Sequence, residues 1–153
     1  MSEIARILDQ MDRAFSGSAW HGPSLMALLE GLSAEDASRH SIPAAHSIWE
    51  LVQHIGAWNT IVQHRLNGEH MEVTTEIDWP PIWEASDIAW SRAVENLAAS
   101  RGRLRRVAEG LRDDQLAEIP AGCRDSRYVM LHGVVQHDLY HAGQIAVLKK
   151  ALA

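Results

Sequence analysis

Two histidines near the end of the chain have the spacing of a helical metal-binding pair. His137 and His141 lie in the stretch HDLYHAGQIAVLKK (137–150), and residues four apart on a helix share one face, about 6 Å apart at Cβ. Four apolar residues lie on the same stripe: Met130, Val134, Ile145 and Leu148. Burying two imidazoles there costs free energy unless both are hydrogen-bonded or coordinate a metal, and a single metal ion can bind both. The spacing predicts either part of a metal site or two core histidines bonded to other groups.

A metal site needs a third ligand from another helix, and helical periodicity selects it among the nine histidines. His54 lies in ELVQHIGAW, one turn from Leu51 and Trp58, on the apolar stripe of its segment. His54, His137 and His141 are therefore the candidate ligands. Three neutral imidazoles with an open position are typical of a catalytic zinc site. One divalent transition metal is expected, zinc or nickel before iron, manganese, cobalt or copper.

Several other residues are candidates to support this site or to line a pocket beside it. His46 begins the same predicted helix about two turns earlier, which suits a cap or a bond to a ligand histidine. Gln144 shares the face of the pair and would either orient a bound water or substrate or bond another helix. Tyr140 and Asp138 point elsewhere on their helix, where each either bonds a ligand histidine or is simply exposed. Tryptophans are the expected apolar walls of the pocket: Trp49, Trp58, Trp79 and Trp83.

Composition excludes several classes of protein. Hydrophobic residues make up 46% of the 153 residues, which argues against disorder. The net charge is −6, so a nucleic-acid partner is not expected, and RGRLRR (101–106) is interpreted as a solvated helix face. HDLYH also lacks the glutamate of the HExxH protease motif, because Asp138 stands in its place. No membrane span or signal peptide is expected, and a single cysteine excludes an internal disulfide, so the prediction is a cytoplasmic protein.

Helical patterns position these residues, and no convincing strand is present. Long helices are predicted over 3–15, 45–66, 86–111 and 126–152, with a short helix over 24–32 and a capped turn beginning at Ser33. A loop of about 17 residues containing DWPPIW (78–83) separates the second and third long helices, and loops of that length are usually functional. The fold class is all-α, a four-helix bundle, with residues 1–153 as a single domain.

Three segments together resemble the DinB/YfiT-like superfamily of metal-binding four-helix bundles: WHGPSL (20–25), HSIWELVQHIGAW (46–58) and HDLYHAGQIAVLKK (137–150). The resemblance implies a bundle of up-down-down-up order with a long crossover between the second and third long helices. It also implies a homodimer. Members of this superfamily hold a divalent metal on one histidine of the second long helix and on an HxxxH pair of the last. Those positions match His54, His137 and His141.

The resemblance supports a metal site better than it supports one reaction. Some branches are thiol S-transferases that use bacillithiol, mycothiol or glutathione, others resemble metal-dependent hydrolases or isomerases, and many have no known activity. The first hypothesis is thiol S-transfer to a small-molecule substrate through a metal-bound thiolate, with a low-molecular-weight thiol as cofactor. Two alternatives stay open: a hydrolase that uses metal-bound hydroxide, and a non-catalytic dimeric bundle that binds a metal or a ligand. Structural zinc usually has four protein ligands, and the sequence offers three.

Overall fold

Capped helices account for most of the chain in a computed structural model that describes residues 1–153. The four long helices are α1 (Glu3–Phe15), α4 (Ile48–Leu66), α6 (Asp87–Glu109) and α7 (Arg127–Lys150). The connections hold α2 (Leu25–Leu29), α3 (Ala34–Ser38), α5 (Thr75–Asp78) and a single 3-10 turn, η1 (Asp113–Gln115). The prediction of an all-α chain without strands is confirmed.

Serine caps set where the helices begin. The predicted capping box at Ser33 is present, with Asp36 as its acidic partner. A second capping box, made by Ser47 and Glu50, starts α4. The second long helix therefore begins at Ile48 and not at Ala45 as predicted, because Ser47 takes the extended conformation of an N-cap and satisfies the free amide of Glu50. His46 consequently lies in the loop before the helix and does not begin it.

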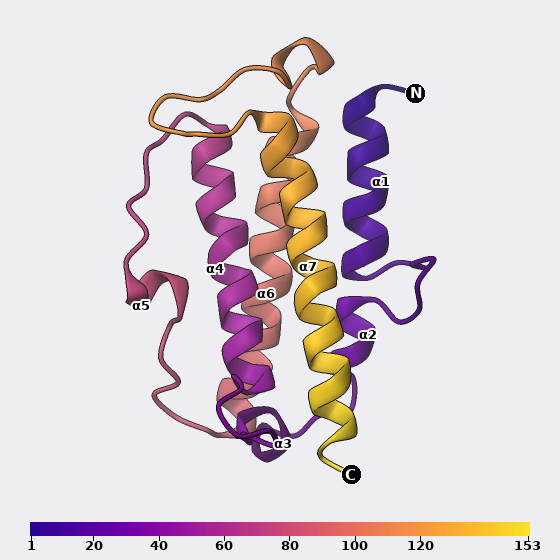
Figure 1. Cartoon of the computed structure of the whole chain (residues 1–153), viewed down its shortest axis with the longest axis vertical. Coiled ribbons are helices and arrows are strands. Elements are labelled where there is room, and N and C mark those ends of the chain that lie inside the picture. Colours follow the sequence, from indigo (N-terminus) through magenta and orange to yellow (C-terminus); the bar gives the residue numbers. More distant parts are fainter.

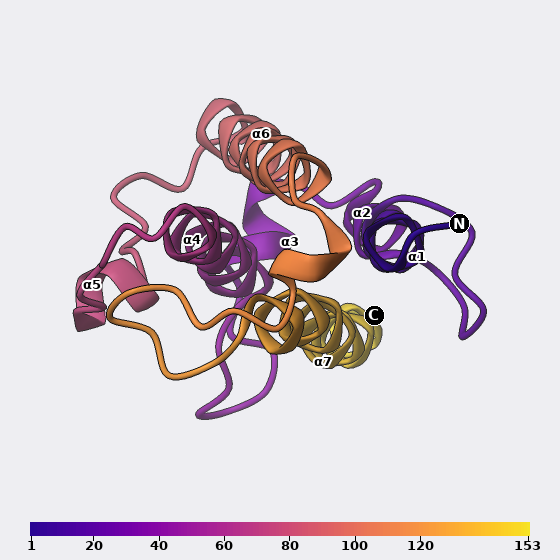
Figure 2. The same cartoon turned by 90° about the horizontal axis from the view of Figure 1, so that it is seen from above.

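The four long helices form a bundle in which α1 and α7 run one way while α4 and α6 run the other (Figure 1). The chain leaves the end of α4, returns along the outside of the bundle through α5, and then enters α6 parallel to α4 (Figures 1 and 2). The expected up-down-down-up order with a long crossover is confirmed. This crossover carries residues 67–86 past the middle of α4, where His54 lies.

Two clusters of buried apolar side chains hold the bundle together. One lies at the end of the bundle near α2 and α3 and includes Trp49, Ile55 and Leu97. The other lies toward the opposite end, where the predicted apolar side of α1 packs on α4, α6 and α7. Removing such surfaces from water supplies roughly 25 cal/mol per Å² of apolar area. None of the helices combines the length and the apolarity that crossing a membrane requires.

The interpretation of RGRLRR as a solvated helix face is wrong for its first residue. Arg101 is only 4% exposed and pairs with Asp138 of α7, which is 1% exposed. Its guanidinium also lies 4.8 Å from the centre of the Phe15 ring. Residue 101 lies on the side of α6 that faces the inside of the bundle, and its guanidinium reaches the carboxylate of Asp138 on α7. A buried arginine needs such a carboxylate partner. Asp138 therefore bonds Arg101 and does not bond a ligand histidine.

Candidate metal centre

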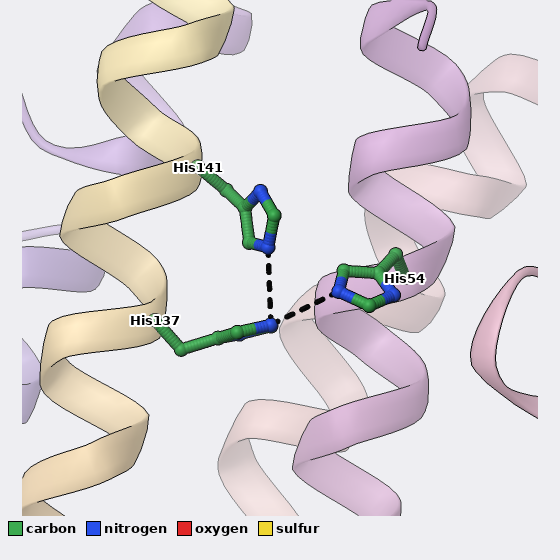
Figure 3. Close-up of side chains that lie close together, drawn as sticks. All are labelled: His54, His137 and His141. Carbon is green, nitrogen blue, oxygen red and sulfur yellow. Dashed lines mark hydrogen bonds between the residues drawn. The ribbon is translucent and has the colours of Figure 1, made fainter.

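The structure brings together the three histidines that the sequence singled out. His54 lies in the middle of α4, and His137 and His141 lie one turn apart on α7, with all three rings pointing at one another (Figure 3). The Nε2 atom of His137 is 3.0 Å from Nε2 of His54 and 3.1 Å from Nε2 of His141. One ligand atom from each residue lies within 4.8 Å of the other two. No cysteine or carboxylate joins this group.

Hydrogen bonds on the outer side of two of the rings set which nitrogens face inward. Nδ1 of His54 donates to the backbone carbonyl oxygen of Asp78 at 2.8 Å. Nδ1 of His141 donates to Oε1 of Gln144 at 2.6 Å. With the proton on Nδ1, a neutral imidazole presents its Nε2 lone pair toward the centre of the triad. Metal-ligating histidines are oriented by outer hydrogen bonds of this kind.

The donor set fits a divalent transition metal. The Nε2 atoms of His54 and His141 carry lone pairs and act as acceptors. Nε2 of His137 carries at most one proton and can donate it to only one of them, so the centre holds more acceptors than donors. Two nitrogens bound to one zinc ion at about 2.0–2.1 Å lie roughly 3–3.4 Å apart, close to the spacings found. Burial and the neighbouring imidazoles lower the pKa of His137 to about 3. Burial also lowers the pKa of His141, so both rings are neutral at pH 7, as ligands must be.

The crossover, residues 67–86, orients the ring of His54 through contacts that were not predicted from the sequence. The ring of Trp79 stacks on His54, with centroids 4.0 Å apart, and on its other face stacks on His46 at 3.6 Å. The carboxylate of Asp78 accepts a hydrogen bond from Nε1 of Trp58 at 2.8 Å. DWPPIW marked the loop as functional, but the Asp78 carbonyl is a backbone group that no residue pattern identifies.

A pocket of about 460 Å³ opens beside the triad. The three histidines form one part of its wall, and Trp58, Val62, Met130 and Val134 supply apolar surface. Tyr140 also lines it, largely exposed, with its ring centre 5.0 Å from that of His141. Ligand sites for small molecules have volumes of this order.

The remaining candidates lie outside this pocket. Trp49 is buried in the core against Trp90, since it precedes His54 by five residues and therefore points to a different side of α4. Trp83 is almost fully exposed on the crossover. His46 stacks on the ring of Trp79, and its Nδ1 lies 3.5 Å from the carboxylate of Glu50.

Comparison with known proteins places the chain in a family. The family model described as the DinB superfamily matches residues 20–145. A crystal structure of a conserved protein from Enterococcus faecalis is similar, with a TM-score of 0.71 and 15% sequence identity over 99% of this chain and 97% of that one. That identity is low, so the likeness supports the fold alone. No curated protein matches the sequence. The family match covers most of the chain, and the protein belongs to the DinB superfamily.

Proposed function

We propose that this protein is a metal-dependent enzyme acting on a small molecule, and that its reaction is thiol S-transfer. The observation that carries the proposal is the convergence of three imidazole Nε2 atoms at the wall of an accessible pocket. Three protein ligands leave a tetrahedral site with a position for an exogenous ligand, as in catalytic zinc sites. A divalent transition metal held there would supply the charge that lowers the pKa of a bound thiol or water.

The residues of the chain have definite roles in this proposal. His54, His137 and His141 hold the cation, while the Asp78 carbonyl and Gln144 keep two of the rings in the required tautomer. Trp58 and the apolar side chains of the pocket keep water away from the bound molecules.

Thiol transfer fits the acid–base groups of the pocket better than hydrolysis does. The carboxylate of Asp78 accepts from Trp58 and lies on the outer side of the His54 ring, away from the centre of the triad. Asp125 is exposed. In S-transfer, sulfur forms a bond to an electrophilic carbon, the leaving group departs with its bonding electrons, and the thiol proton passes to solvent. Neither reaction would need a separate base, because a metal would lower the pKa of a bound thiol or water alike. Hydrolysis also needs a proton for its leaving group, and neither carboxylate is placed to supply one, whereas S-transfer with a leaving group that departs as an anion needs none.

The first test is the metal content of tag-free protein beside matched histidine variants. We expect about one transition metal per chain in the wild type, since the triad forms one site. His54→Ala and His137→Ala should retain helical content and lose the metal. His64→Ala is the control, because His64 lies on the same helix and pairs with Glu69. Wild-type metal content in both triad variants would refute the site.

Activity assays then separate the reactions. The metal-loaded protein is mixed with bacillithiol, mycothiol or glutathione and a chromogenic electrophile, and in parallel with ester and amide substrates. Thiol consumption that disappears in His137→Ala supports S-transfer. Hydrolysis without thiol consumption would replace S-transfer by the hydrolase alternative. A metal-loaded protein inactive in both assays, with a fold that collapses when the metal is removed, would instead identify a structural metal.

A further inference from the structure

The pocket beside the triad contains one permanently charged cation, Arg65 of α4. Arg65 follows His54 by eleven residues, close to three full turns, so both side chains lie on the same side of α4. Its Cζ atom lies 5.6 Å from the centre of the Trp58 ring, which places the guanidinium over that ring. Helical side chains lean toward the N-terminus, and this direction brings the guanidinium back along the pocket toward the histidines.

No carboxylate of the chain neutralises Arg65. Other buried or half-buried arginines have partners: Arg101 pairs with Asp138, and Arg105 with Asp12. Arg65 is half-buried, and its side chain makes neither an ion pair nor a hydrogen bond. Two carboxylates line the same pocket, but that of Asp78 is held by Trp58, and Asp125 is exposed on the rim. The guanidinium therefore keeps its donors free for a ligand.

Trp58 links the cation to the site of chemistry. The centre of the Trp58 ring lies 6.0 Å from that of the His137 ring, and the guanidinium of Arg65 lies over the Trp58 ring. Val62, Met130 and Val134 line the pocket with these groups and offer no hydrogen bonds from their side chains. A molecule that fills this pocket meets the triad at one end, apolar surface along its middle and a free guanidinium at the other end.

We propose that Arg65 is the specificity-determining residue of the pocket, and that its small-molecule ligand carries a carboxylate at the end remote from the triad. This inference rests on the proposed function, because it assumes that a small molecule occupies the pocket. A guanidinium matches a carboxylate bidentately, and its partial burial strengthens the pair relative to one in bulk water. If the substrate is a low-molecular-weight thiol, the inference selects thiols with a carboxylate over neutral ones.

The test compares two ligands of similar shape, charged 3-phenylpropanoate and neutral 3-phenylpropanamide, by calorimetric titration of the protein as purified. The phenyl ring suits the apolar walls, and the carboxylate or amide reaches the guanidinium. We expect the wild type to bind the carboxylate about tenfold more tightly than the amide, as a charge-assisted hydrogen bond provides. Arg65→Gln should remove that preference. Arg106→Gln should keep it, since Arg106 is an exposed arginine of α6 outside the pocket.

A further variant separates this inference from the proposed function. His54→Ala removes a proposed metal ligand but leaves Arg65 in place, so the carboxylate preference should persist in it. A preference that survives in Arg65→Gln and disappears in His54→Ala would mean that the carboxylate binds at the triad, which overturns the role of Arg65 while supporting the metal site. Equal binding of the two ligands, or binding of neither, by the wild type would also overturn it.

Discussion

Gln144 offers a direct test of how the triad is organised. Its side-chain oxygen accepts the hydrogen bond from Nδ1 of His141 at 2.6 Å and so directs the Nε2 lone pair of that ring toward the other two histidines. In Gln144→Ala the ring loses this acceptor, and the opposite tautomer, with the proton on Nε2, becomes accessible. We expect weaker metal binding with an unchanged fold, because Gln144 is exposed and packs in neither apolar cluster.

The structure indicates the size of this effect. Removing an outer hydrogen-bond partner of a metal-ligating histidine typically lowers metal affinity by roughly 10- to 100-fold. Water can reach the exposed position of Gln144 and accept from Nδ1 in its place, so the loss should lie at the lower end, about tenfold, or roughly 1.4 kcal/mol. His54 differs, since its acceptor is a backbone carbonyl that no substitution removes.

Competition with a chromogenic chelator measures the affinity of each variant for zinc. Gln144→Glu should bind zinc at least as tightly as the wild type, because a carboxylate is the stronger acceptor. Gln136→Ala, an exposed glutamine of the same helix that makes no side-chain hydrogen bond, is the control. Equal affinities for Gln144→Ala and the wild type, or an equal loss in Gln136→Ala, would refute the argument that Gln144 orients His141.

Two further predictions concern stability. The pKa of His137 is about 3 in the folded protein, below its value of about 6.5 when unfolded, so the unfolded chain binds more protons between these values. The contribution of His137 to the stability of the metal-free protein should therefore be largest above pH 6.5 and fall by at most about 2 kcal/mol by pH 5, and urea titrations of the wild type and His137→Asn should differ by this pH-dependent loss. Asp138→Asn leaves Arg101 charged and unpaired in the core and should cost about 3–5 kcal/mol in urea unfolding, whereas Asp12→Asn, at a surface pair with Arg105, should cost under about 1 kcal/mol. A small effect of Asp138→Asn would mean that Arg101 finds another partner or leaves the core.

Much of the fold was predictable because it depends on short-range order. The helices predicted over 86–111 and 126–152 from apolar periodicity begin within one residue of α6 and α7, whose N-caps are Ser86 and Ser126. The start of α4 was placed too early, since Pro43 indicated the boundary before the helix, whereas the N-cap is Ser47. Arg101 was misjudged because its burial depends on which side of α6 faces the inside of the bundle, where its guanidinium reaches Asp138 of α7, and a run of arginines does not reveal which one faces inward.

The metal centre likewise has features that the sequence predicted and features that only the tertiary structure shows. The sequence by itself determined that His137 and His141 share a helix face and that His54 lies on the inner stripe of another helix, since both follow from 3.6 residues per turn. Only the tertiary structure decided that the crossover brings the Asp78 carbonyl and the Trp79 ring to His54, twenty-four and twenty-five residues further along the chain. It also decided that Trp58 and Arg65, and not Trp49, line the pocket. Helical periodicity relates residues within a few turns, whereas these contacts depend on the path of an irregular segment and on the packing of helices distant in sequence.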